Sequence, residues 1–253
     1  MPTNPSTTPT LVRFYDPTIQ APDPSGRTVS SILALPDTDL EHHHDYIQLL
    51  FPLPEPSPYH PTAPVIDRAT FAAFRSRPDL RSQLLHSLTR MLHFYGLDLP
   101  ARPRRPPAPD DDDDDDDDPR PEIVRGANFA RASRNWVRRF DHNHLRITRI
   151  VRSLRVLGLE GHAAALFRAL GAVYDGGRAG IGAKSMMFWT RAAERPLHLA
   201  PEDERDEGRG KDFLYEYEAS RRAGANGDGD GGDGAREGKG LGGEGAGEKD
   251  GAA

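Results

Sequence analysis

Apolar residues recur at helical spacing along much of this chain, and this periodicity limits the fold more than any other feature of the sequence. The clearest stripes lie in residues 78–96 and 143–159. Each stripe ends at a glycine, Gly96 or Gly158, and Leu159 is placed to fold back on the second helix as in a Schellman ending. The apolar positions are Leu80, Leu84, Leu88, Met91, Leu92 and Tyr95 in the first stripe, and Ile147, Ile150, Val151, Leu154 and Leu157 in the second.

Side chains that can cap a helix stand before several other segments. Thr28 or Ser30 can begin a short helix that Pro36 closes, and Asp39 can begin another that runs to Phe51. On the latter helix, three consecutive histidines would fall on the exposed first turns. The other expected caps are Asp67, Ser76 (at capping-box spacing from Asp79) and Asn143, and further helices are expected at 160–174 and around 183–193.

Alternation of apolar and polar residues, which is typical of half-buried strands, is confined to two short patches. Leu11 to Tyr15 is a short apolar and aromatic stretch that can pack in an extended form against the first helices. The sequence therefore predicts an all-α fold, organised as a single compact multi-helix domain over residues 11–200.

The chain has 25 glycines and 23 prolines, well above average usage, so part of it is not expected to fold. Residues 1–10 are expected to be disordered. Residues 100–121 combine prolines, arginines and a run of aspartates, and we expect a disordered Pro/Asp-rich insertion there. Residues 201–222 are charged but hold an aromatic cluster that can pack against the domain, and residues 223–253 read as a disordered Gly/Asp/Glu-rich tail.

The formal net charge of −6 hides an uneven distribution. Nine aspartates occupy positions 110–118, and the tail from residue 223 onward is also acidic. Without these two segments the remaining chain carries a net charge of +7. The part of the chain that is expected to fold is therefore basic.

Several classes of protein are disfavoured by what the sequence lacks. There is no cysteine, hence no disulfide, thiolate zinc site or cysteine nucleophile, and no window has the ~18 apolar residues of a membrane span or the pattern of a signal peptide. No nucleophile elbow, phosphate loop or HExxH motif occurs. Consecutive residues on a helix diverge by about 100°, so the histidines at 42–44 cannot converge on one metal ion. We expect no enzyme activity, no catalytic residue, no metal and no cofactor.

Four blocks of sequence, in this order and spacing, resemble the conserved domain of the opioid growth factor receptor (OGFr) family. The blocks are RFY at 13–15, HDYIQLLFPLPEPS at 44–57, MLHFYG at 91–96 and NWVRRFDHNHLRITRIVRSLRVLGLEG at 135–161. The aspartate run falls between two of them. The residues that we regard as the structural signature are Asp45, Tyr46, Ile47, Leu50, Phe51, Pro52, Trp136, Leu145, Ile147, Ile150 and Leu154.

The resemblance implies a function that residue chemistry alone does not. Proteins of this family are described as receptors for an opioid pentapeptide, unrelated to the seven-helix opioid receptors, that act in growth inhibition around and inside the nucleus. The expected protein is thus a non-enzymatic regulatory receptor or scaffold that binds a peptide or protein. It is expected inside the cell, in the nucleus or cytoplasm, with peripheral association at a membrane such as the nuclear envelope. The C-terminal repeats of vertebrate members have no counterpart in the tail.

An arginine-rich stretch supplies the alternative function. Residues 120–168 carry eleven arginines against three acidic residues, and nearby aromatic residues can stack on bases, so a nucleic-acid-associated module is the second hypothesis. The competing interpretation is that the arginines are the solvated or salt-bridged faces of amphipathic helices. The aspartates at 110–118 can fold over this basic face or remain a solvated insertion. The candidate anion- or partner-binding residues are Arg131, Arg134, Arg138, Arg139, Arg146, Arg149, Arg152 and Arg155.

Overall fold

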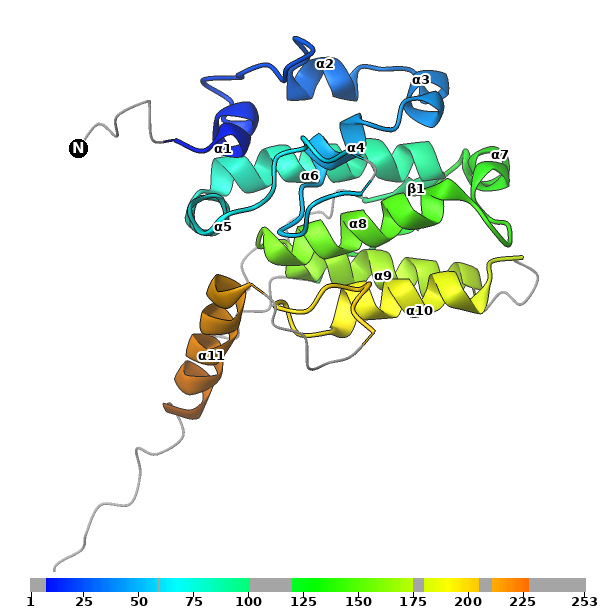
Figure 1. Ribbon diagram of the computed structural model, residues 1–253. Helices are drawn as coiled ribbons and strands as arrows, with labels where there is room; N and C mark the ends of the chain where they lie inside the picture. The colour runs from blue at the N-terminus through cyan, green and yellow to red at the C-terminus, as the bar shows by residue number, and fades with distance from the viewer. Residues whose placement is uncertain (1–7, 59, 101–119, 175–179, 205–210, 228–253) are drawn as a thin grey trace, which may run out of the picture. The chain divides into compact units, whose positions relative to one another are not determined.

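The computed structural model describes residues 8–58, 60–100, 120–174, 180–204 and 211–227 (Figure 1). The all-α prediction is confirmed, because helices dominate these residues and the strands are limited to one short pair. The aspartate run at 110–118 and the tail beyond residue 227 lie outside the described residues. The helices are α1 (Thr10–Tyr15), α2 (Val29–Leu33), α3 (Asp37–His42), α4 (Tyr46–Leu50), α5 (Arg68–Ser76), α6 (Pro78–Tyr95), α7 (Phe129–Ala132), α8 (His142–Val156), α9 (Glu160–Tyr174), α10 (Ala183–Glu194) and α11 (Asp212–Gly227).

The chain divides into two units, Met1–Glu218 and Ala219–Ala253, and the first unit contains every side-chain contact discussed below. Within it, α8 packs against both α9 and α10, while α1, α2 and α5 pack on the long helix α6 (Figure 1). The first turns of α11 join this unit through Phe213 and Tyr217, whose rings contact Phe71. Helix α11 extends past residue 223, where we expect the acidic tail to begin.

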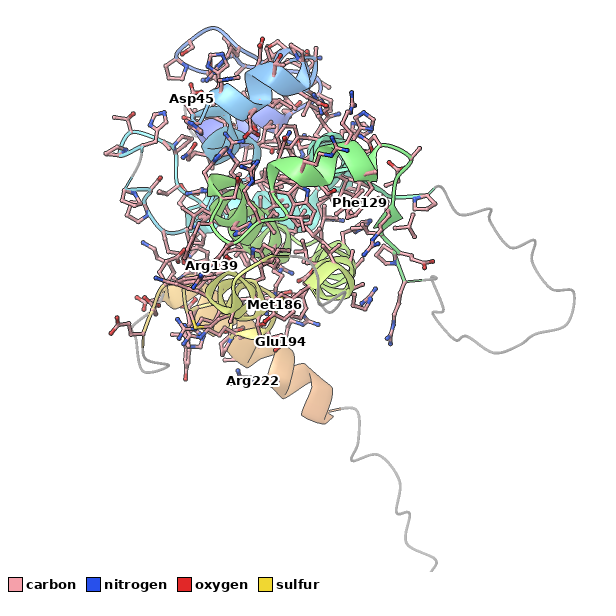
Figure 2. The ribbon with its side chains drawn as sticks, turned by 90° about the vertical axis from the view of Figure 1, so that its right-hand side faces the viewer. Asp45, Phe129, Arg139, Met186, Glu194 and Arg222 are labelled. Carbon is pink, nitrogen blue, oxygen red and sulfur yellow. The ribbon has the colours of Figure 1, made fainter. Side chains whose placement is uncertain are left out.

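The core forms along the two stripes that the sequence predicts. Their apolar side chains on α6 and α8 are almost completely inaccessible, and side chains fill the space between the helices (Figure 2). Trp136 is fully buried and its indole donates to the carbonyl of Tyr95 at 3.0 Å, which joins the segment before α8 to the end of α6. Each large apolar side chain buried in this way contributes roughly 1.5–3 kcal/mol before entropy is subtracted.

Several helix boundaries agree with the sequence prediction. Thr28 forms a capping box at the start of α2, and Asp67 accepts a hydrogen bond from the Thr70 amide at the start of α5. Gly96 ends α6 in the left-handed conformation at φ 79°. The Schellman ending of α8 is also present, since the Leu159 amide donates to the Leu154 carbonyl at 2.8 Å.

The prediction of one helix from Asp39 to Phe51 is wrong. Helix α3 ends at His42, His43 adopts an extended conformation, and α4 begins only at Tyr46. The break is stable because carbonyl groups released from the helix accept hydrogen bonds from the arginine at position 146 on α8, at 3.0 Å for Leu40 and 2.8 Å for His43. A tertiary contact therefore replaces the local helical bonds.

The extended conformation predicted for Leu11–Tyr15 is also wrong, because these residues form most of α1. The helix places four apolar side chains in the core, and the Tyr15 ring meets Phe74 edge-on at 5.1 Å. A short apolar run does not by itself distinguish a buried helix from a buried strand. In the helix the four buried side chains share one face, and Arg13 between them is exposed to solvent.

Three predicted caps are wrong. Asp39 lies inside α3, which begins at Asp37 after Pro36. Asp141, not Asn143, caps α8, because its carboxylate accepts from the Asn143 amide at 2.8 Å while Asn143 itself lies inside the helix. Ser76 is the last residue of α5, and its hydroxyl donates back to the Ala72 carbonyl, so it does not cap α6. In addition, a two-stranded antiparallel pairing of β1 (Leu97–Asp98) and β2 (Val124–Arg125) follows α6.

Candidate functional site

One face of α8 contacts residues 42–56 (HHHDYIQLLFPLPEP), the segment that contains the end of α3 and all of α4. Arg146 binds carbonyls at the break between α3 and α4, Arg149 donates to the Phe51 carbonyl at 3.1 Å, and Arg152 donates to Glu55 at 2.7 Å. Residues three apart on a helix share a face, so the three guanidinium groups follow the segment along the helix. The arginines thereby join the segment to α8 at three points.

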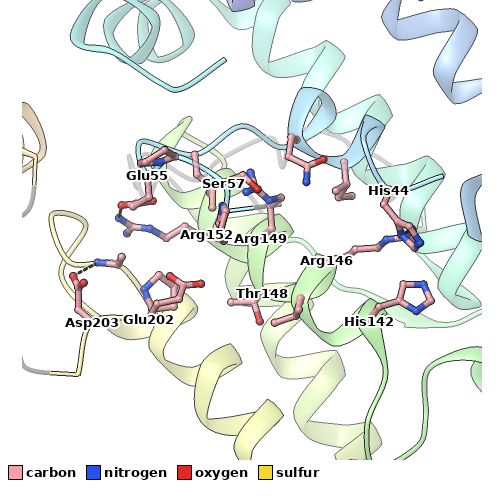
Figure 3. A pocket seen from close by; sticks show the side chains of 18 residues that line it. His44, Glu55, Ser57, His142, Arg146, Thr148, Arg149, Arg152, Glu202 and Asp203 are labelled. Carbon is pink, nitrogen blue, oxygen red and sulfur yellow. Dashed lines mark hydrogen bonds and ion pairs between the residues drawn. The ribbon is translucent and has the colours of Figure 1, made fainter. Parts of the chain in front are cut away.

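A pocket of about 820 Å³ lies between this segment, α8 and residues 200–203 (Figure 3). This volume is within the range of small-molecule and short-peptide sites, roughly 300–1,000 Å³. Figure 3 shows Glu55, Arg152, Glu202 and Asp203 toward one end, and His44, Arg146 and His142 toward the other. The apolar lining is formed by Ile47, Leu53, Pro56, Pro58, Leu145, Ala200 and Pro201.

Charged groups in the pocket wall are only partly compensated. Arg152 is buried and pairs with Glu55, yet its Nε and the Oε2 atom of Glu55 have no hydrogen-bond partner among the described residues. Desolvation lowers the pKa of Arg149 below its ordinary value, and desolvation raises the pKa of Glu202 above its ordinary value. The pocket therefore places the partly buried guanidinium of Arg149 in the same lining as the exposed carboxylate of Glu202.

The histidine end of the pocket consists of two imidazole rings beside a guanidinium. The rings of His44 and His142 meet edge-on at 5.1 Å, and Nδ1 of His44 lies 2.8 Å from the Arg146 guanidinium. Desolvation, followed by the charge of Arg146, lowers the pKa of His44. Across the described residues no three His, Asp or Glu side chains gather as metal ligands.

A second hollow, of about 510 Å³, adjoins the first. The two share His142, Leu145 and Thr148, and the second extends to Arg139, Phe140 and Lys184. Phe140 and Leu145 are unusually exposed for apolar side chains, at 76 % and 52 %. Apolar surface therefore lies open on this side of α8.

The eight candidate arginines separate into two groups. Arg131, Arg134, Arg138 and Arg139 are exposed in the segment that precedes α8. The four on α8 point into contacts with the fold: Arg146 and Arg152 are buried, and Arg155 donates to the carbonyls of Ala192 and Arg195. The structure thus does not bring all eight onto one surface.

The signature residues are mostly core residues. Asp45 instead pairs with Arg27 at 2.7 Å, and Leu145 faces the pocket. The signature residues that are buried are Tyr46, Ile47, Leu50, Phe51, Pro52, Trp136, Ile147, Ile150 and Leu154.

Sequence reasoning did not find Glu55 or Glu202 as pocket residues. Glu202 lies far along the chain in a charged stretch without a motif, so nothing in the sequence pairs it with α8. One usable signal exists for the arginines. Arg146, Arg149, Arg152 and Arg155 recur every third residue, directly beside the apolar stripe of their helix, which indicates that their stems lie along the core boundary.

The fold and the site together define a class: a helical domain with a ligand-sized, partly apolar pocket beside one arginine-rich helix. The model of the opioid growth factor receptor (OGFr) conserved region matches residues 6–105 and 114–173. The chain therefore belongs to the OGFr family.

Sequence similarity to individual proteins supports this assignment to the OGFr family. The chain is 36 % identical over 129 residues to the opioid growth factor receptor of Mus musculus, and 35 % identical over 135 residues to that of Homo sapiens. It is 32 % identical over 135 residues to opioid growth factor receptor-like protein 1 of Mus musculus. Each match covers 51 % of this chain but only 18 %, 16 % and 24 % of the respective relative. No solved structure matches the chain.

Proposed function

We propose that this OGFr-family chain is a non-enzymatic regulatory receptor or scaffold that binds a peptide or a protein segment in the pocket beside α8. The observation that carries the proposal is the pocket itself, which combines an apolar lining with a few convergent charged groups in a volume suited to several amino-acid residues. The names of the relatives, which call them receptors for an opioid growth factor, support a ligand-binding role.

The nucleic-acid alternative has weaker support. Phosphate recognition needs arginines with free donors on an accessible surface. Arg146 and Arg152 are buried and bonded within the fold, and Arg155 donates to two carbonyls. The remaining exposed arginines lie before α8 and form a smaller surface than the sequence suggests.

The cellular setting that accompanies this proposal is the one that the family resemblance implies, the nucleus or the cytoplasm. Across the residues that the structure describes, no helix is long and apolar enough to cross a membrane.

A titration of the purified chain with the opioid pentapeptide, followed by calorimetry, tests the proposal. Leu145→Lys places a charge on exposed apolar pocket surface, and we expect it to weaken binding by about five-fold or more, because roughly 1 kcal/mol of apolar burial is lost. Ile19→Lys is the matched control, since Ile19 is 48 % exposed and lies outside the pocket lining.

Salt separates the two hypotheses. Binding in a partly apolar pocket should change little between low and physiological salt, whereas binding of an oligonucleotide should fall steeply. Equal loss of peptide affinity in the Leu145→Lys and Ile19→Lys variants would contradict the proposed site, and absence of peptide binding would contradict the proposed function.

A further inference from the structure

Arg149 differs from Arg152, which also makes a single hydrogen bond, because its bond goes to a backbone carbonyl and not to a carboxylate. A guanidinium has five N–H donors. Arg146 contacts the carbonyls of Leu40, Glu41 and His43 as well as two side chains, and Arg152 forms an ion pair. Arg149 makes one hydrogen bond, to the Phe51 carbonyl, and contacts no carboxylate among the described residues.

The surroundings of Arg149 make its charge costly. Its side chain is partly buried in the pocket wall. The apolar side chains beside it reduce its contact with water. The carboxylates of Glu202 and Glu55 act on it through their charge alone. A ligand that brings an anionic group within hydrogen-bonding distance would supply the partner that the fold leaves out.

The surfaces next to Arg149 limit what else the ligand can be. Ile47 and Leu53 line the same pocket, and Leu145 follows on the same face of α8. An apolar side chain near the anionic group can pack there. An inorganic anion alone would leave this apolar lining exposed.

We propose that Arg149 binds a carboxylate of the ligand, so that the pocket prefers a peptide carrying a carboxylate next to an apolar side chain. This inference rests on the proposed peptide-binding function and adds the chemical group that is recognised. The carboxylate can be the free C-terminus of a short peptide or an acidic side chain in a longer one, because both present the same two oxygens to the guanidinium.

Glu202 opposes the ligand carboxylate at the same place. It is the first of the two carboxylates whose charge acts on Arg149, and it lines the pocket. Removing its charge with Glu202→Gln should therefore strengthen binding of a carboxylate-bearing peptide by a few-fold and leave an amidated peptide unaffected.

The test compares the opioid pentapeptide as the free acid and as the C-terminal amide, by calorimetry on the full chain. The unmodified protein should bind the acid at least about ten-fold more tightly, as expected for a charge-assisted hydrogen bond. In Arg149→Met, which keeps the length of the stem, this ratio should approach one. Arg139→Met removes an exposed cation from the adjoining hollow and should preserve the ratio.

The ratio of acid to amide affinity is measured within each variant. A general loss of stability in Arg149→Met would weaken binding of both peptides and would therefore leave the ratio unchanged. Arg149→Lys, which retains a charge without the bidentate fork, should keep part of the preference. An amidated peptide whose last residue is replaced by glutamate distinguishes the two carboxylate sources: restored affinity indicates an acidic side chain, and no restoration indicates the C-terminus.

Equal binding of acid and amide by the unmodified protein would overturn the role of Arg149 and leave the proposed peptide-binding function standing. A ratio that survives in Arg149→Met would likewise overturn it. If neither form binds, the proposed function itself is contradicted, and the inference that depends on it falls as well.

Discussion

At the scale of single residues, buried charges are used to connect distant parts of the chain. Asp16 is buried at the end of α1, where its carboxylate accepts hydrogen bonds from Thr18 and, at 2.7 Å, from Arg77. Arg146 similarly satisfies three carbonyls more than a hundred residues away in the chain. Loss of a hydrogen bond to a charged group of this kind costs roughly 1.5–3 kcal/mol.

The carboxyl group of Asp16 gives a pH-dependent prediction. Desolvation opposes ionisation, but the hydrogen bonds from Thr18 and Arg77 outweigh it and lower the pKa from 3.8 to about 2. Because the pKa is lower in the folded state, this stabilisation is present above about pH 4 and is lost as the pH falls toward 2. It amounts to about 2 kcal/mol.

Urea unfolding at a series of pH values measures this effect. Between pH 4 and pH 2 the free energy of unfolding should fall more for the unmodified protein than for Asp16→Asn, by about 2 kcal/mol. Parallel pH profiles for the two proteins would show that Asp16 does not carry this dependence.

At the scale of secondary-structure elements, the end of α6, which packs against α7, depends on a glycine. Gly96 has a left-handed backbone, and a Cβ atom there would lie 2.7 Å from the backbone of Phe129. Gly96→Ala should therefore destabilise the domain by about 2 kcal/mol or more. Gly171→Ala is the matched control in α9, where a Cβ would meet nothing within 4 Å, and it should stabilise the domain by about 0.5–1 kcal/mol.

Thermal unfolding followed by circular dichroism compares these two glycine variants directly. A Gly96→Ala protein as stable as the unmodified one would mean that the contact between α6 and α7 is looser than described here. Destabilisation by Gly171→Ala would mean that α9 is packed more tightly around that position.

Some of the secondary-structure elements can be predicted from the sequence alone, and others cannot. Long amphipathic helices such as α6 and α8 follow from their periodicity, and the glycines at positions 96 and 158 mark where they end. The break between α3 and α4 does not follow, because the donor that stabilises it is Arg146, far away in the chain. Local propensity cannot report a bond of that kind.

At the scale of the whole molecule, the candidate site also depends on contacts between residues far apart in the sequence, which local patterns do not reveal. The pocket draws its walls from residues 44–58, from α8 and from residues 200–203, and only the folded chain brings these together. The sequence gives the positions of the arginines on α8 but not the direction of their side chains. A basic helix can present its charges either to solvent or to neighbouring carbonyls. The family resemblance implies a peptide ligand, and the pocket beside α8 is the site that we propose for it.

Our central claim is that a peptide binds in the pocket beside α8. Amide hydrogen exchange of the full chain, with and without the opioid pentapeptide, tests it most directly. Exchange should slow on binding in residues 44–58 and 142–152, which contribute to the pocket lining. It should be unchanged in α5 and α9, which contribute no residue to that lining. Protection that appears in α5 or α9 but not along the pocket would contradict the account, as would saturable binding with no change in exchange at residues 44–58.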